Sequence, residues 1–426
     1  MPQLTMTDVT KKVLANGITV IVDRGVHFRA VSIVLCLIGG SRDEQLQTLG
    51  LTHLLEHLLL KRTKRRSTLE LAEYMDELGG TVNAYTDTES LCIFGTVSQN
   101  DWRKLLTLFS ELLLEPDFRE EDLSLEKLII RQEILESEDD PSEVVGEEFA
   151  KQLWPESMLG LPVFGTTDTV DQCSLDAVRA RCLELIAGER IVIVASGNVS
   201  ADEVATEVEN IFTHLPTAPR PTSLPPKVGH GVHLVPVSVS QVYIALGCPW
   251  PGMQHSDYLA GLIISNVLGG TMSSRLFQEL REKRGLAYSI YSDVEAYPDI
   301  GALVIGACVE RTTLQATLAA MSEQVGLLRE TQITGEELRR TKQMMLAQML
   351  MNMDDGEGRM WRALRSELNF GRYVSVDEVS EKLTRISLDD IRTLATRSLE
   401  CGKFLLIVGG ELDGLEVTGE IRKLCE

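Results

Sequence analysis

The sequence contains little that favours secretion, a membrane or nucleic acid. Its 41 lysine and arginine residues face 63 aspartate and glutamate residues, and the formal net charge is -22. This balance argues against a nucleic-acid partner, because phosphate binding rewards basic surfaces, and the basic run KRTKRRS over residues 61–67 is interpreted as a solvated loop. No apolar run reaches the length of a membrane span, and residues 1–17 contain no apolar core of signal-peptide length. We therefore expect a cytoplasmic protein with no membrane partner.

Cysteine pairs of the kind that bind metals or form disulfide frameworks are also lacking. The eight cysteines are scattered, and none belongs to a CxxC pair. Several, such as Cys36 in VSIVLCLIGG, lie in apolar runs typical of buried strands. Thiols in such runs behave as small hydrophobic residues of a reduced protein. Any metal site must therefore use other ligands.

Histidine is scarce too, yet two of the seven histidines lie in the pentapeptide His-Leu-Leu-Glu-His. On a helix, His53 and His57 lie one turn apart on the same face, so both imidazoles can reach one metal ion. Glu56 is close enough to meet a water molecule on that metal and is poorly placed to be a third ligand. The order is the inverted form of the zinc-peptidase signature H-E-x-x-H. The segment predicts two ligands of a metal site, with Glu56 as a candidate base beside them.

A third ligand must come from another segment, because a catalytic zinc usually holds three protein ligands and leaves one position for water. The segment LSLEKLIIRQEILESEDD, which begins at Leu123, has the pattern of a packed helix. Glu126 and Glu133 lie two turns apart on one of its faces. A lone glutamate on a helix is usually solvated, and that interpretation would hold for either residue taken alone. The pattern itself leaves open which of the two binds the metal.

The chain repeats one order of elements. The strand-like segments AVSIVLCLIGG and QVYIALGCPW each precede an apolar helix pattern, and each half closes with a strand, a glycine turn and a helix. Val31 and Val242 are 211 positions apart (242 − 31), and Gly197 and Gly409 are 212 apart (409 − 197). So steady an offset indicates two similar α+β domains from one duplicated unit.

A proline-rich segment separates the two copies. Residues 215–232 contain five of the fourteen prolines, which is typical of a semi-rigid linker. We predict an N-terminal zinc-binding domain over residues 1–214 and a C-terminal domain over residues 233–426. The C-terminal helix that corresponds to the histidine helix has no histidine or glutamate at the matching positions. One copy would therefore hold the metal, and the other would be free for a different task.

These motifs resemble the M16 metallopeptidases, the group of pitrilysin, insulysin and the mitochondrial processing peptidase, and in particular the short bacterial M16B members. The resemblance rests on HLLEH, GGSRDE, LGGTVNAYT, PVFGT and a glutamate 76 positions after His57 (133 − 57), and it covers nearly the whole chain. It implies a LuxS/MPP-like metallohydrolase fold of class α+β, with two homologous domains, each a mainly antiparallel sheet packed with helices. It also implies one zinc ion per chain, with His53, His57 and Glu133 as ligands and Glu126 as a supporting carboxylate.

The resemblance further implies residues for peptide binding. Arg281 and Tyr288, seven positions apart in LREKRGLAYSIYS, match the family's arginine–tyrosine segment and could donate to a peptide carbonyl. Arg284 remains an alternative arginine. Asn83 and Ala84 fall in a segment that, in the family, pairs with an extended substrate. Without the resemblance, a surface arginine, a strand tyrosine and an ordinary edge strand would be simpler interpretations.

Together, these features predict a zinc metalloendopeptidase that cleaves unfolded or extended peptides inside a dimer chamber. Glu56 would activate the zinc-bound water, and Arg281 and Tyr288 would stabilise the oxyanion. A chain of this length supplies half of the family's chamber, so we expect a homodimer, or a heterodimer with a related chain. The alternative is a catalytically silent or partner-dependent scaffold subunit of a processing complex, and a silent scaffold would not need stoichiometric zinc.

Overall fold

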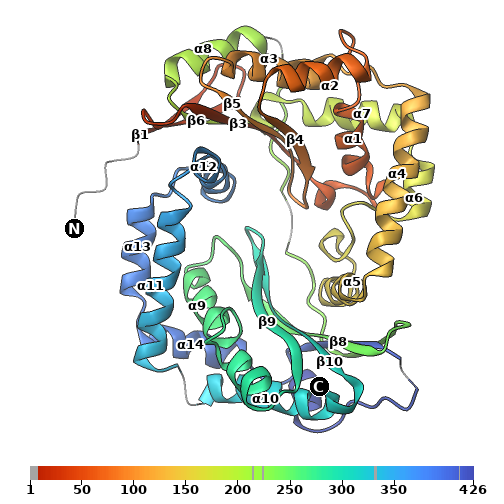
Figure 1. Ribbon diagram of the computed structural model, residues 1–426, viewed down its shortest axis with the longest axis vertical. Coiled ribbons are helices and arrows are strands. Elements are labelled where there is room, and N and C mark those ends of the chain that lie inside the picture. The colour runs from red at the N-terminus through yellow and green to blue at the C-terminus, as the bar shows by residue number, and fades with distance from the viewer. Residues whose placement is uncertain (1–7, 214, 223–224, 331–332, 412) are drawn as a thin grey trace. The chain divides into compact units, whose positions relative to one another are not determined.

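The computed structural model describes residues 8–213, 215–222, 225–330, 333–411 and 413–426. These residues form two compact units, each with one mainly antiparallel sheet packed against helices (Figure 1). The predicted α+β class with two similar domains is confirmed. No helix of the described residues is long and apolar enough to cross a membrane. All eight cysteines are free, and seven of them are buried, as expected for small residues in apolar runs.

The first unit is built on a six-stranded sheet in the order β1-β2-β6-β3-β5-β4, in which only the β2–β6 pair is parallel. The central strand β3 is apolar almost throughout because its residues alternate between two cores. The strands are β1 Asp8–Val13, β2 Thr19–Arg24, β3 Ala30–Ile38, β4 Thr81–Thr86, β5 Ser90–Ser98 and β6 Ile191–Gly197.

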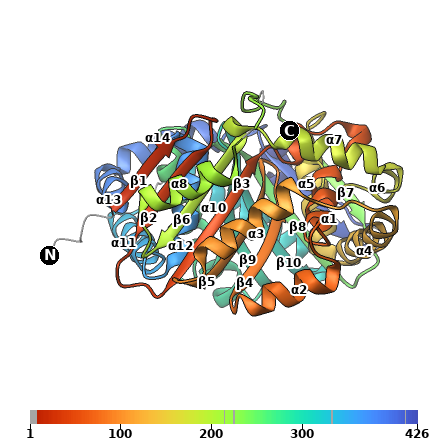
Figure 2. The same cartoon turned by 90° about the horizontal axis from the view of Figure 1, so that it is seen from above.

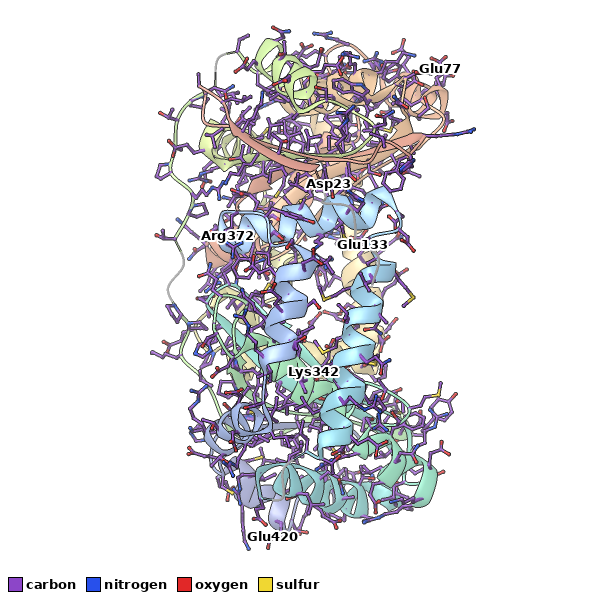
Figure 3. All side chains as sticks on the ribbon, turned by 90° about the vertical axis from the view of Figure 1, so that its left-hand side faces the viewer. Asp23, Glu77, Glu133, Lys342, Arg372 and Glu420 are labelled. Atoms are coloured by element: carbon purple, nitrogen blue, oxygen red, sulfur yellow. The ribbon has the colours of Figure 1, made fainter. Side chains whose placement is uncertain are left out.

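Helices cover both faces of this first sheet. Helices α3 and α8 contact one face, and Figure 2 shows them lying over the sheet. Helix α12 packs on β3 and β6 at the other face, where the buried Asp23, labelled in Figure 3, forms a forked ion pair with Arg359. The helices of this unit are α1 Leu51–Leu59, α2 Thr68–Glu77, α3 Trp102–Leu114, α4 Glu120–Asp139, α6 Thr167–Gln172, α7 Leu175–Leu185, α8 Ala201–Ile211 and α12 Gly356–Phe370.

The second unit repeats the arrangement with five strands in the order β7-β11-β8-β10-β9, in which only the β11–β7 pair is parallel. This order matches β2-β6-β3-β5-β4 of the first unit strand for strand. The strands are β7 Gly231–Pro236, β8 Gln241–Pro251, β9 Ala287–Ala296, β10 Ile300–Glu310 and β11 Leu405–Gly410. The helices are α5 Pro141–Leu153, α9 Tyr258–Leu268, α10 Leu314–Glu330, α11 Gly335–Met351, α13 Val376–Arg385, α14 Leu388–Ser398 and α15 Glu420–Cys425.

The compact units differ from two continuous halves of the chain, because each sheet recruits a helix from the opposite half of the sequence. Helix α5, from the N-terminal half, packs on β8 and β11 of the second unit, and α12, from the C-terminal half, packs on the first. Each sheet has apolar residues on both faces, and these two helices cover the second face. Continuous domains over 1–214 and 233–426 did not anticipate this exchange. Residues 214 and 223–224, at and within the predicted linker, lie outside the described residues.

Candidate active site

The motif GGSRDE fixes the start of helix α1. Gly50, with a φ of 90°, precedes the helix in the left-handed conformation that glycine tolerates best. The Glu44 carboxylate accepts the backbone N–H groups of Gly50 at 2.8 Å and of Thr52 at 2.6 Å. Arg181 donates to the Thr52 hydroxyl at 3.0 Å and to the carbonyl of Gly40 at 3.0 Å. The two bonds to Glu44 satisfy N–H groups that a helix start otherwise leaves unpaired.

The apolar spacing of α1 determines which residues remain available for chemistry. Its buried leucines pack into the main core of the first unit, and the residues between them form a half-buried polar side. His53, Glu56 and His57 make up that side, because positions three and four apart share one helix face. The buried leucines are Leu51, Leu54, Leu55, Leu58 and Leu59.

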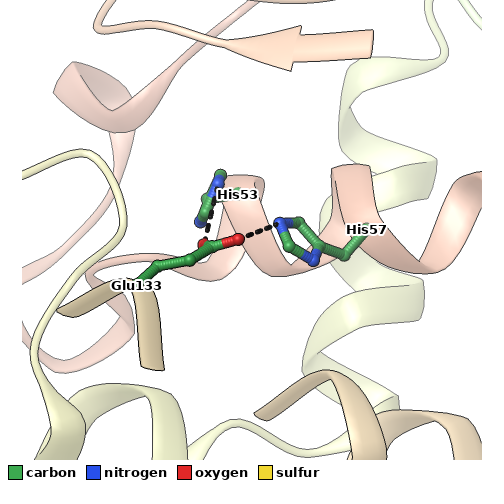
Figure 4. Close-up of side chains that lie close together, drawn as sticks. All are labelled: His53, His57 and Glu133. Atoms are coloured by element: carbon green, nitrogen blue, oxygen red, sulfur yellow. Dashed lines mark ion pairs between the residues drawn. The ribbon is translucent and has the colours of Figure 1, made fainter. Parts of the chain in front are cut away.

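Glu133 of α4 meets both histidines. Its two carboxylate oxygens lie 3.8 Å from His53 Nε2 and 3.7 Å from His57 Nε2 (Figure 4). Both distances are too long for hydrogen bonds, whereas two ligand atoms each about 2.1 Å from a tetrahedral zinc lie about 3.4 Å apart. The three ligand atoms fall within 4.8 Å of one another, and no other group of three or more His, Cys, Asp or Glu residues in the described ranges could hold a metal ion.

A second carboxylate orients His57. Glu126 Oε2 lies 3.0 Å from His57 Nδ1, and Lys61 Nζ lies 2.5 Å from Glu126 Oε1. A carboxylate at Nδ1 stabilises the proton there and leaves the Nε2 lone pair facing Glu133, which is the usual arrangement behind a metal-binding histidine. The geometry thus separates the two glutamates that the helix pattern had left equivalent. Glu133 faces both imidazoles, and Glu126 lies behind one.

The two histidines titrate differently. Burial, with a contribution from the neighbouring His57, lowers the pKa of His53 to about 4, so its imidazole is neutral near pH 7. Burial also lowers the pKa of His57, but the hydrogen bond to Glu126 and the charges of Glu133 and Glu56 outweigh it, and the pKa rises above its usual value. Burial likewise opposes ionisation of Glu126, yet its bonds to His57 and Lys61 hold its pKa below the usual value. His57 is therefore the imidazole for which protons and a metal ion compete.

Glu56 has a partner that the sequence did not reveal. The Thr86 hydroxyl at the end of β4 donates to Glu56 Oε2 at 2.7 Å. Burial raises the pKa of Glu56, and the bond to Thr86 and the charge of His57 only partly offset this effect. A raised pKa suits a general base that works near neutral pH. The alternation of a strand puts Ala84 and Thr86 on one face, but it does not show that Glu56 lies against that face.

The basic run after α1 is not the solvated loop that was predicted. Lys61 pairs with Glu126, and the arginines of the run pair with carboxylates on α4 and on or directly after α3. Most of these side chains are at least three-quarters buried because carboxylates of α3 and α4 face the run. The pairs are Arg62 with Asp122, Arg66 with Glu111 and the more exposed Arg65 with Glu115.

The predicted peptide-pairing residues lie on strand β4, at the edge of the sheet. Only β5 pairs with this strand among the described residues. Asn83 is exposed, and its side-chain oxygen accepts the N–H of Ala84 at 2.9 Å. Ala84 itself is buried in the main core of the first unit. A peptide added to this edge would meet the Asn83 side chain and the backbone of Ala84.

Arg281 and Tyr288 lie together in the second unit. Arg281 belongs to the π-helix Phe277–Lys283, and its guanidinium lies 4.9 Å from the ring of Phe277 and 5.9 Å from that of Tyr288. Tyr288 is the second residue of β9 and is 78% exposed. Arg281 has no ion pair among the described residues, whereas the alternative Arg284 pairs with Glu279 and Glu323. Arg281 is therefore the arginine of this segment with a free guanidinium near the tyrosine.

Comparison with known proteins places the chain in a family. It is 30% identical over 381 residues to the uncharacterized zinc protease YmxG of Bacillus subtilis, a match that covers 89% of this chain and 93% of that protein. The chain belongs to peptidase family M16. The model described as insulinase (peptidase family M16) matches residues 20–167, and the model described as the peptidase M16 inactive domain matches residues 172–345.

Further relatives of this M16-family chain agree in class and fold. An uncharacterized zinc protease of Streptomyces coelicolor is 30% identical over 94% of this chain and 89% of its own length. The crystal structure of a protease from Helicobacter pylori has a TM-score of 0.87 at 19% identity and covers 95% of this chain and 100% of that chain. A peptidase M16 inactive domain from Pseudomonas fluorescens gives the same TM-score at 17% identity, over 97% of this chain and 99% of that chain. The curated names support a protease class, and the solved structures support the fold.

Proposed function

We propose that this M16-family protein is a zinc-dependent endopeptidase that cleaves unfolded or extended peptides. The convergence of His53, His57 and Glu133 is the observation that carries the proposal. Two imidazoles and one carboxylate are a donor set of catalytic zinc sites, which leave a fourth position for water. The relatives named zinc proteases support the same metal and reaction class.

The residues around the cluster supply the groups that peptide hydrolysis requires. Zinc bound to this donor set would supply a Lewis acid that acidifies water and polarises a carbonyl group. Glu56 would accept a proton from the attacking water, and its raised pKa suits that role. The same carboxyl would deliver this proton to the amine as the peptide C–N bond breaks. Glu126 and Lys61 would keep the Nε2 lone pair of His57 directed toward Glu133.

Substrate binding is proposed on the edge strand β4. A peptide paired there through backbone hydrogen bonds would be selected for extended shape more than for sequence. Asn83 and Ala84 would contact that peptide, and Arg281 and Tyr288 would donate to its carbonyl groups. We also propose a homodimer, or a heterodimer with a related chain, as the working form. Sedimentation that shows a monomer at working concentration would contradict this proposal.

A catalytically silent subunit is the second candidate. The observation that favours it is the description "inactive domain". Both the family model that matches residues 172–345 and the Pseudomonas fluorescens structure carry this description. The cluster of His53, His57 and Glu133 lies outside residues 172–345, in the region that the insulinase family model matches. The peptidase proposal therefore requires only the first repeat to be catalytic.

The decisive experiment compares the wild type with Glu56→Gln. Zinc content is measured by mass spectrometry of the metal, and cleavage of unstructured peptides is mapped with and without a chelator. We expect about one zinc per chain in both proteins and a fall in kcat of about 10²- to 10⁴-fold in the variant. A zinc-loaded Gln variant with full activity would sink the assignment of the base. A wild type with neither zinc nor cleavage would favour the silent subunit.

A further inference from the structure

The contact between Thr86 and Glu56 joins a strand to the proposed base. The hydroxyl-to-carboxylate distance of 2.7 Å is typical of a charge-assisted hydrogen bond. No other side chain of the described residues donates a hydrogen bond to Glu56. Thr86 is thus the side chain through which the surrounding protein can set the orientation of this carboxylate.

The position of Thr86 is itself well determined. It pairs with Leu91 in the β4–β5 ladder. On the opposite face of the strand, the preceding Tyr85 packs against Trp361 of α12 and against Phe94 of β5, at ring distances of 5.4 and 6.1 Å. A β-branched threonine also has few χ1 choices. The hydroxyl therefore occupies a place set by the sheet rather than by its own flexibility.

A carboxylate without such a partner is free to turn, because the terminal torsion of glutamate has a broad energy profile. A general base must bring one oxygen within hydrogen-bond reach of the proton that it removes. We infer that Thr86 is a positioning residue for Glu56. The Thr86 hydroxyl holds one carboxylate oxygen of Glu56 and thereby leaves the other oxygen free to take the proton of the attacking water. The inference rests on the proposed function.

The same contact connects peptide binding to the base. Thr86 follows Asn83 and Ala84 on β4, the strand on which an extended peptide is proposed to pair. The hydrogen bond from Thr86 thereby links strand β4 to Glu56. Loss of the hydroxyl should leave peptide pairing intact, since it takes place along the backbone. The effect is therefore expected in kcat and not in KM.

Three variants test this role. Thr86→Val keeps the shape of the side chain and removes the hydroxyl, and Thr86→Ser keeps the hydroxyl. Thr96→Val is a matched control, because Thr96 is a half-buried strand threonine of the same sheet that bonds Ser32 at 2.8 Å and does not contact Glu56. Each variant is assayed for zinc content, kcat and KM with one unstructured peptide.

We expect Thr86→Val to lower kcat by about ten- to a hundredfold, the range for losing one hydrogen bond to a charged group, with KM and zinc content unchanged. Thr86→Ser should recover most of the loss, and Thr96→Val should match the wild type. An unchanged kcat in Thr86→Val overturns the inference. A loss that Ser does not restore, that Thr96→Val shares or that accompanies zinc loss also overturns it.

Comparison with Glu56→Gln and with the wild type distinguishes a failure of the Thr86 role from a failure of the proposed function. If Glu56→Gln is inactive and zinc-loaded while Thr86→Val keeps full activity, the positioning role falls and the proposed function stands. If Glu56→Gln keeps full activity, the assignment of the base falls, and the role of Thr86 falls with it. If the wild type has neither zinc nor cleavage, the proposed function falls.

Discussion

Helices α1 and α9 are the matching first helices of the two repeats, but α1 carries polar residues where α9 carries apolar ones. Helix α1 presents His53, Glu56 and His57 to one side, whereas α9, at the offset of 211, has Ile264, Val267 and Leu268 at the matching positions, all of them buried. The first turns of α4 and α11 match at an offset of 215, at which Glu133 corresponds to the exposed Gln348, since 133 + 215 = 348. The second repeat therefore folds without a metal-binding set of residues at these places. The fold does not require the polar cluster, which points to a chemical role for it.

What the two repeats share is an arginine–carboxylate pair beside those helices. Arg62 bonds Asp122 in the first turn of α4, and Arg275 bonds Glu337 in the first turn of α11. The pairs correspond at offsets of 213 (275 − 62) and 215 (337 − 122). In both units, the pair ties the segment after the first helix to the long helix. This shared tie can hold the helices in place, and the histidine cluster is left for chemistry.

The strongest test converts the first repeat toward the second. In the triple variant His53→Ile, His57→Leu and Glu133→Gln, we expect complete loss of zinc and of peptide cleavage. We also expect a folded protein whose melting temperature is at least that of the metal-free wild type. The reason is that apolar residues of similar volume often replace buried polar groups without loss of stability. Zinc analysis, a cleavage assay and thermal unfolding check the result.

Unfolding of the triple variant would show that the cluster also supports the fold. The matched control is the wild type stripped of metal by a chelator, which keeps the polar side chains. His255→Gln, at an exposed histidine of the second unit, controls for the loss of a histidine elsewhere. It should leave zinc content and cleavage unchanged.

A smaller effect is expected from the carboxylate behind His57. Glu126→Gln keeps the shape of the side chain and removes the charge that stabilises the Nδ1 proton. Loss of such a partner typically costs about 10- to 100-fold in metal affinity. Zinc competition with a fluorescent chelator measures the change. Glu120→Gln, at an exposed position of the same helix, should leave the affinity unchanged.

The pH dependence of zinc binding separates the two histidines. The pKa of His57 is raised above its usual value, and that of His53 is lowered to about 4. Zinc binds neutral imidazole, so its affinity should fall as the pH drops through the raised pKa of His57. Between about pH 5 and 6.5, we expect a loss of about tenfold per pH unit, because only one proton competes there. A loss of about a hundredfold per unit in that range would mean that both histidines compete.

The sequence predicted those parts of the site whose geometry is local. The helical period places His53, Glu56 and His57 on one face without reference to the rest of the fold, and the family resemblance singled out Glu133. The bond from Thr86 to Glu56 joins residues 30 positions apart on different elements, so no local period reveals it. For the same reason, the sequence did not reveal on which sheets helices α5 and α12 pack. Their apolar faces predict burial, but the choice of sheet depends on contacts between distant segments.

The smallest expected effect concerns the shared arginine pair. Burial opposes ionisation of Glu337, yet its bonds to Arg275 and Thr334 outweigh burial and lower its pKa to about 2. A carboxyl whose pKa is lower in the folded than in the unfolded protein stabilises the fold above the unfolded value. That stability is lost as the pH falls from about 4.5 toward 2. Glu337→Gln should therefore lower the free energy of unfolding by about 1–2 kcal/mol at pH 7 and by less at pH 3. Urea unfolding measures both values, with the exposed neighbour Glu336→Gln as the control. An equal loss at both pH values would mean that the variant acts through packing. The charge of the Arg275–Glu337 pair would then not be what holds the helix in place.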